Sequence, residues 1–106
     1  MIREFKGVAV VVNANIYFHG NVTSRTILFP DGNKKTLGII LPGTYEFEVG
    51  DEEEVEIISG SADVLLPHTS DWRNIKIGES FKVDANTHFQ IRSTEIVDYI
   101  CSYLTN

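Results

Sequence analysis

Turn-forming residues divide this chain of 106 residues into short segments, and their spacing restricts the possible folds more than any other feature. Proline, glycine and short polar residues cluster at residues 30–33, 42–43, 50–51, 59–60, 67–71 and 78. Such clusters favour turns over regular structure. Strands are therefore predicted near residues 7–12, 16–22, 25–29, 35–41, 44–48, 54–58, 61–66, 72–77, 80–83, 88–92 and 96–104. Many short strands at this spacing indicate a closed barrel or a two-sheet jelly roll.

Composition also favours strands. Valine, isoleucine and threonine total 30 residues, whereas alanine, leucine, methionine and glutamine total 12. Branched side chains fit a pleated surface better than a helix. Polarity alternates as well, because Tyr45, Phe47 and Val49 share one strand face while Glu46 and Glu48 take the other. The sequence therefore predicts an all-β fold with little or no helix, in one domain over residues 1–106.

The net charge of −6 comes from one acidic segment, because residues 46–56 hold seven acids and no base. No block of lysine or arginine is available to neutralise a nucleic-acid backbone, so nucleic-acid binding is not expected. The longest apolar run, residues 8–12, is far shorter than the roughly 20 residues of a membrane helix. A single cysteine, Cys101, allows no internal disulfide and favours the cytoplasm. Its place on the apolar side of a strand favours a buried, inert thiol.

Two spacings resemble the conserved motifs of cupins, which are small double-stranded β-helix barrels. Glu53-x6-Gly60 matches the end of the first cupin motif, and Gly78-x5-Asp84-x-Asn86 matches the second. In metal-binding cupins a pair of histidines precedes the glutamate, but here Glu46 and Glu48 occupy those positions. The three histidines of the chain are scattered, without the spacing of a metal site. No metal is therefore expected.

A closer likeness extends from Tyr17 to Tyr103. It rests on seven ordered segments: YFHGNVTS at 17–24, TLGIILPGTYEF at 36–47, EEVEIISG at 53–60, VLLP at 64–67, DW at 71–72, FKVDANTHF at 81–89 and YICSY at 99–103. Together these segments resemble the small cupin-like pyrimidine/purine nucleoside phosphorylases of bacteria. Asp84 departs from the usual proline of the second motif. Residues 1–12 look like an N-terminal extension strand upstream of the common core.

The resemblance implies a cupin-like double-stranded β-helix barrel, or jelly roll. It also implies phosphorolysis of varied purine and pyrimidine ribonucleosides to free base and ribose 1-phosphate. The enzyme would be cytoplasmic and a homodimer, with phosphate as co-substrate and no metal or other cofactor. Two alternatives stay open: a non-catalytic cupin-like module that binds a sugar or nucleotide, and a metal-dependent cupin oxygenase or isomerase.

Glu53 is the candidate catalytic residue because its cupin motif position often points into the barrel. There it would bind ribose hydroxyls or stabilise positive charge developing at the anomeric carbon. The alternative is that Glu53 belongs to a solvated loop with its acidic neighbours. The other six acids of the segment are expected to face solvent, because a phosphate substrate would be repelled by an acidic pocket.

Six residues are candidates for substrate binding. Hydroxyls and amides at turns can hold phosphate, which nominates Ser59, Asn86 and Thr87. Three arginines could also help to bind phosphate: Arg25, Arg73 and Arg92. For any one of them, a solvated position on a strand is the simpler interpretation. Aromatic faces stack on any base and so permit broad specificity. This nominates Trp72, Phe89 and Tyr99, with Tyr45 and Tyr103 as further walls, unless these aromatics only fill the barrel.

Overall fold

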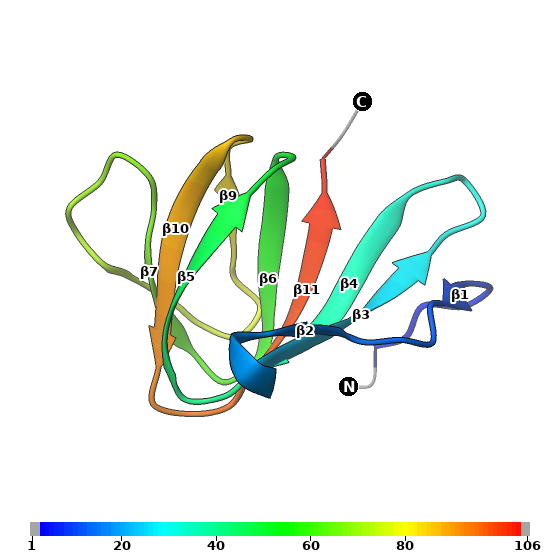
Figure 1. Ribbon diagram of the computed structural model, residues 1–106, viewed down its shortest axis with the longest axis horizontal. Coiled ribbons are helices and arrows are strands. Elements are labelled where there is room, and N and C mark those ends of the chain that lie inside the picture. The colour runs from blue at the N-terminus through cyan, green and yellow to red at the C-terminus, as the bar shows by residue number, and fades with distance from the viewer. Residues whose placement is uncertain (1–2, 105–106) are drawn as a thin grey trace.

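Two antiparallel sheets pack face to face in the computed structural model, which describes residues 3–104 (Figure 1). The larger sheet has the strand order β1 (Ala9–Val10), β3 (Val22–Leu28), β4 (Lys34–Ile40), β11 (Val97–Tyr103), β6 (Glu53–Ser59) and β9 (Ser80–Val83), and β2 (Asn15–Tyr17) also pairs with β3. The smaller sheet has the order β5 (Gly43–Val49), β10 (Thr87–Ser93), β7 (Ala62–Leu65) and β8 (Arg73–Ile75). The all-β, cupin-like prediction is confirmed. Helix is limited to one turn in the described residues, η1 (Phe18–Gly20), and none there could span a membrane.

The strand predicted over residues 16–22 is wrong in its second half. Strand β2 ends at Tyr17, and the turn η1 follows with Phe18 and His19 at positive φ angles of 52° and 59°. Such angles are uncommon outside glycine and break a strand. The turn holds because the Asn21 side-chain amide donates a hydrogen bond to the carbonyl of Phe18. This reversal lets β2 fold back and pair antiparallel with β3.

The strand predicted over residues 7–12 is shorter than expected, because only Ala9–Val10 pairs with β3. By contrast, the turn predicted at residues 30–33 is present, and it joins β3 to β4 in an antiparallel hairpin. Asp31 stabilises its tip by accepting hydrogen bonds from the backbone and side-chain amides of Asn33. This is the local role expected of aspartate in a turn.

The core lies between the two sheets and consists mainly of branched aliphatic side chains. The largest completely buried ones are Val22, Ile57, Val64, Val83, Ile91 and Val97. Burial of each such side chain contributes about 1.5–3 kcal/mol. The predicted alternation on β5 is also present, since Tyr45 and Val49 are buried whereas Glu46 and Glu48 are exposed.

Strand pairing lines up the inward side chains of the larger sheet in rows. Strand β11 lies between β6 and β4, so its inward residues Tyr99 and Cys101 each have a partner on both sides. Tyr99 stands opposite Ile57 on β6 and Gly38 on β4, while Gly38 stands opposite Ser24 on β3. Gly38 leaves the space that the ring of Tyr99 occupies, since a Cβ there would lie 2.5 Å from the Tyr99 ring and hydroxyl.

Replacing Gly38 by alanine should lower the free energy of unfolding by about 1–3 kcal/mol, the usual range for overpacking. The added carbon would also lie 2.5 Å from the backbone carbonyl of Thr23, which cannot move without disturbing the sheet. Urea denaturation measures the change. Gly50→Ala is the matched control, because nothing lies within 4 Å of a Cβ there. Equal stabilities of the two variants would contradict this account of Gly38.

Candidate active site

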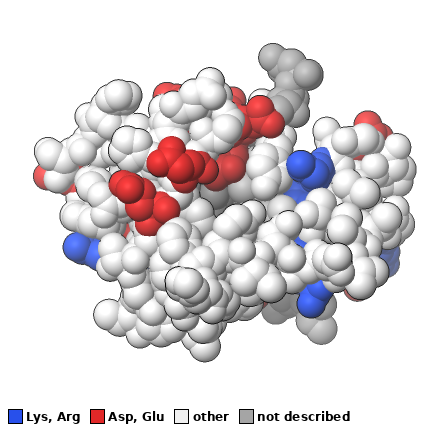
Figure 2. Space-filling model, viewed as in Figure 1, with Lys and Arg blue, Asp and Glu red and all other residues white. Residues whose placement is uncertain are grey.

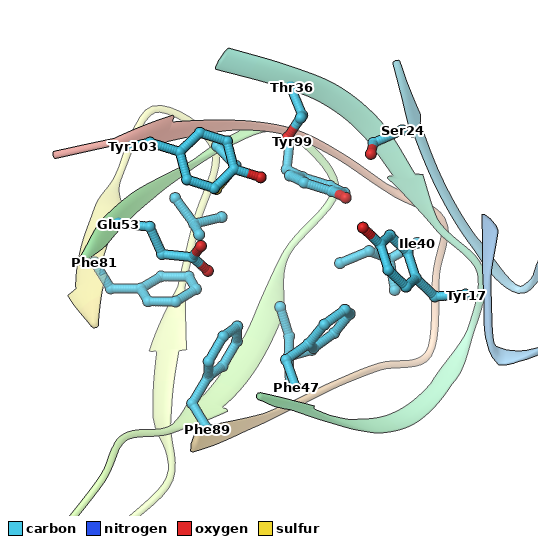
Figure 3. A pocket seen from close by; sticks show the side chains of 13 residues that line it. Tyr17, Ser24, Thr36, Ile40, Phe47, Glu53, Phe81, Phe89, Tyr99 and Tyr103 are labelled. Atoms are coloured by element: carbon cyan, nitrogen blue, oxygen red, sulfur yellow. The ribbon is translucent and has the colours of Figure 1, made fainter. Parts of the chain in front are cut away.

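A cavity of about 120 Å³ lies between the sheets, and its two walls differ in chemistry (Figure 3). Hydroxyl-bearing side chains and one carboxylate come mostly from the larger sheet, and phenylalanines face them. The side chains that line it are Tyr17, Ser24, Thr36, Ile40, Phe47, Glu53, Val55, Phe81, Phe89, Ile91, Tyr99, Cys101 and Tyr103. The cavity therefore offers a polar face and an aromatic face to one bound molecule.

Glu53 supplies the only carboxylate among the described residues that line the cavity. It begins β6 on the same face as Val55 and Ile57, and it stands opposite Tyr103 on β11. Figure 3 shows its carboxyl group directed into the cavity, on the same side as the Tyr103 hydroxyl. Burial raises the pKa of Glu53 above 4.5, while a hydrogen bond with Cys101 opposes this effect. A partly buried acid with a raised pKa in a cavity is typical of a functional site.

The neighbours of Glu53 remain protonated at neutral pH and can donate hydrogen bonds. Burial raises the pKa of Cys101 to about 12, and the Glu53 charge adds to the shift. Burial also raises the pKa of Tyr103 to about 12, with further contributions from Cys101 and Glu53. The pKa of Tyr99 is raised above its ordinary value by burial, against a hydrogen bond with Ser24. Cys101 is thus a buried thiol with little thiolate, as predicted.

The aromatic wall is built around Phe89 of β10. Phe47 of β5 stacks on it with ring centroids 5.4 Å apart and an interplanar angle of 16°. Phe81 of β9 meets Phe89 edge-on, with centroids 5.5 Å apart. Tyr17 contacts Phe47 edge-on at 6.4 Å and is 46% exposed, so it lies where the cavity reaches the surface. The wall presents apolar ring surface without donors or acceptors that would select one heterocycle.

The structure brings together three of the seven site residues predicted from sequence. Glu53, Phe89 and Tyr99 all line the cavity, as does Tyr103, which was considered as a further wall. Tyr45 does not line it, because its hydroxyl donates to the carbonyls of Leu41 and Pro42 within the core.

The other four predicted residues lie away from the cavity lining. Ser59 is exposed at the end of β6. Trp72 lies beneath the guanidinium of Arg92, whose Cζ is 3.9 Å from the ring centroid. Asn86 has a φ of 59° and donates its backbone N–H to the carbonyl of Gly50, and Thr87 donates its hydroxyl to the carbonyl of Asp84. Both bonds involve the turn before β10, and neither residue lines the cavity.

Sequence reasoning missed several residues of the lining: Tyr17, Ser24, Thr36, Phe47 and Phe81. For Phe47 a signal existed, because it shares an inward strand face with Tyr45 and Val49. For Ser24 and Thr36 the signal was their spacing from apolar residues, because Ser24 shares a strand face with Val22 and Thr36 shares one with Ile40. The structure buries both hydroxyls on these faces. Tyr17 had no signal, since the turn that follows it was not recognised.

The acidic segment contributes one residue to the cavity. Glu46 and Glu48 are exposed on the outer side of β5, whereas Phe47 points inward between them. Glu54 and Glu56 face outward from β6, where Glu56 pairs with Arg3. Figure 2 shows acidic side chains gathered on one part of the face in view. Within residues 3–104, no three histidines, cysteines or acids are grouped so as to hold a metal ion.

Comparison with known proteins connects this site to a family. The sequence model described as pyrimidine/purine nucleoside phosphorylase matches residues 12–103. A protein of that name from Geotalea uraniireducens is 54% identical over 103 residues, covering 97% of this chain and 99% of the relative. Another from Wolinella succinogenes is 52% identical over 104 residues, covering 98% and 99%.

Solved structures agree with the fold. A protein of unknown function from Acinetobacter sp. ADP1 superposes with a TM-score of 0.92 at 39% identity, covering 94% of this chain and 97% of that one. A cupin superfamily protein from Desulfitobacterium hafniense has a TM-score of 0.66 at 14% identity, covering 90% and 84%, and supports the barrel architecture alone. Because the family model and relatives of about half identity span nearly the whole chain, this chain belongs to the pyrimidine/purine nucleoside phosphorylase family.

Proposed function

We propose that this protein is a nucleoside phosphorylase, a pentosyltransferase that converts purine and pyrimidine ribonucleosides and phosphate to free base and ribose 1-phosphate. The observation that carries this proposal is the cavity itself, in which one carboxylate and several hydroxyls face a wall of stacked phenylalanines. Phosphate is the co-substrate, and no metal or other cofactor takes part. The single buried cysteine is compatible with the cytoplasm as the compartment.

Broad base specificity follows from the aromatic wall. Every nucleobase has an aromatic face, so a planar base can stack against Phe47 and Phe89 whatever its edge pattern. Selection between bases would need fixed donors and acceptors at the base edge, and the phenylalanines have none. The hydroxyls of Tyr99, Tyr103 and Thr36 then face the sugar. The cavity of about 120 Å³ is smaller than a typical ligand pocket of roughly 300–1,000 Å³, so part of a nucleoside extends through the opening near Tyr17.

Glu53 stabilises the reaction centre. As the glycosidic bond lengthens, positive charge develops on the anomeric carbon and the ring oxygen of the ribose. A carboxylate in a partly desolvated cavity stabilises that charge far more than water does. Before the charge develops, the carboxylate accepts hydrogen bonds from ribose hydroxyls. Burial of Glu53 is thus unfavourable in the empty protein and favourable in the transition state.

The activity can be tested with mixed nucleosides after treatment of the protein with a chelator. Base release should require phosphate and should survive chelation, with ribose 1-phosphate formed in equal amount, as measured by liquid chromatography. Release only after metal addition would contradict the proposal. Absence of release with retained nucleoside binding would favour the non-catalytic cupin-like module.

Replacing Glu53 by glutamine should lower kcat by about a hundredfold to a thousandfold, the usual loss when one preorganised electrostatic group is removed. Steady-state kinetics with uridine and with inosine measure the change. The matched control is Glu54→Gln, because Glu54 is the next residue on β6 and faces outward. Unchanged turnover in Glu53→Gln would contradict the role given to this carboxylate.

The same variant should be more stable than the wild type at pH 7. Because the pKa of Glu53 is raised in the folded state, the folded protein binds the proton more tightly than the unfolded chain. Stability therefore falls as the pH rises from the ordinary value of 4.5 through the raised pKa, and glutamine removes this loss. Urea denaturation at several pH values should show the gain at pH 7 disappearing below pH 4.5. A gain in stability with a loss of activity separates the catalytic role from misfolding.

The active protein is proposed to be a homodimer formed through the outer face of the larger sheet. A groove on that face is lined by Ile16, Leu37 and Ile39, all of which are exposed. A two-fold contact places the same patch on both partners, so an apolar patch meets an apolar patch. A second copy of this chain is therefore a chemically matched occupant.

Replacing Ile39 by glutamate should convert the dimer to a monomer, because a two-fold contact would bury the new carboxylates of both copies against each other. Light scattering after size-exclusion chromatography measures the mass. Ile77→Glu is the matched control, since Ile77 is exposed in the loop between β8 and β9, away from the groove. A monomeric wild type, or a dimer in Ile39→Glu, would overturn this interface.

A further inference from the structure

The cavity lacks a positive charge to hold phosphate. Within the described residues, neither lysine nor arginine lines it, and its one ionisable acid is Glu53. Hydrogen phosphate carries about two negative charges near neutral pH, so the Glu53 carboxylate repels it at short range. A cation at the edge of the cavity would offset this repulsion and bring phosphate to the reacting carbon.

Eight of the nine basic residues are placed away from the cavity. Arg3 pairs with Glu56 and Lys6 with Glu4. Arg92 pairs with Asp63 on the outside of the smaller sheet. Two more donate hydrogen bonds: Arg25 to the carbonyl of Val12, and Lys35 to the Ser102 hydroxyl at 2.7 Å. The remaining three are exposed on or near β8 and β9: Arg73, Lys76 and Lys82. The three arginines suggested by sequence are among these eight.

Lys34 is the exception, because strand alternation places it on the inward face of β4. It shares that face with Thr36 and Ile40, which line the cavity. Its ammonium nitrogen lies 4.8 Å from the centroid of the Tyr103 ring, and Tyr103 also lines the cavity. Lys34 itself is exposed, so its charge lies at the surface beside Tyr103.

Strand register explains how this cation comes to lie beside the site. Tyr103 on β11 stands opposite Glu53 on β6. On the other side of β11, Ser102 stands opposite Lys35, so Lys34 lies next to Tyr103 one step further along the antiparallel pair. One row across three strands therefore holds a carboxylate, a phenol and an ammonium group, with the phenol between the two charges.

We propose that Lys34 binds the phosphate co-substrate at the edge of the cavity beside Tyr103, at the other end of β4 from the opening near Tyr17. This inference rests on the proposed function. Phosphate held there has Lys34 on one side and the Tyr103 hydroxyl, a protonated donor, on the other. The Tyr103 ring keeps the Lys34 ammonium group at the rim and limits its direct neutralisation by Glu53.

The transfer step balances with these groups. An oxygen of hydrogen phosphate forms a bond to the anomeric carbon as the bond from that carbon to the base nitrogen breaks. The bonding electron pair stays on the base nitrogen. The proton of hydrogen phosphate accounts for the proton that the released base gains, so no further co-reactant is needed. Lys34 holds the attacking phosphate, and Glu53 stabilises the anomeric carbon between that phosphate and the departing base.

Kinetics of Lys34→Gln test the proposal. The KM for phosphate should rise about tenfold to a hundredfold, the usual effect of losing a hydrogen bond to a charged group. The KM for the nucleoside should change less than twofold, and Lys34→Arg should restore most of the phosphate affinity. Lys35→Gln removes the same charge from the next residue, which faces outward, and should leave the KM for phosphate unchanged. Equal effects of Lys34→Gln and Lys35→Gln would overturn the proposal.

A binding measurement separates this inference from the proposed function. Inorganic phosphate alone is titrated into each protein without nucleoside, and its phosphorus-31 resonance is followed. The wild type should broaden the resonance at a low phosphate concentration, and Lys34→Gln should require a phosphate concentration about tenfold higher for the same broadening. If the wild type cleaves nucleosides but Lys34→Gln binds phosphate normally, only the role of Lys34 fails. If no nucleoside is cleaved by the wild type, the proposed function itself fails.

Discussion

The pairing of β11 with β4 on one side and β6 on the other is the constraint on which the rest of the structure depends. This strand supplies Tyr99, Cys101 and Tyr103 to the cavity, and its register decides what stands beside each of them. Because side chains alternate between faces, a slip of one residue would turn all three outward. The hydrogen bonds that hold the centre of the sheet therefore also assemble the candidate site.

The cavity concentrates one ionisable acid among groups that stay protonated. Burial raises the pKa of Cys101, Tyr103 and Glu53, and the Glu53 charge adds to the shifts of the other two groups. In the empty protein such a carboxylate is an unfavourable group, and its usefulness arises only when a ligand supplies positive charge or donors. Gly38 shows a similar compromise, since it gives up side-chain packing on β4 to make room for the Tyr99 ring.

Sequence alone predicted the parts of the fold that depend on local patterns. Alternation on residues 45–49 correctly separated Tyr45 and Val49 from Glu46 and Glu48. The strand predicted over residues 16–22 is interrupted at Phe18 and His19, because these two non-glycine residues adopt positive φ angles and form a turn. Nothing in their sequence indicates that turn. Among the predicted site residues, Glu53, Phe89 and Tyr99 line the cavity. The polar residues predicted at turns, Ser59, Asn86 and Thr87, do not line it, because composition marks a turn without indicating which cavity the turn borders.

What the sequence by itself determined is therefore the strand character of most segments, the face on which their side chains lie, and the family likeness. These depend on residues close together in the chain, where the two-residue period of a strand applies. Only the tertiary structure decided that Lys34, Tyr103 and Glu53 lie side by side on three neighbouring strands. Pairing between distant strands is chosen by packing of the whole core, which no local pattern encodes.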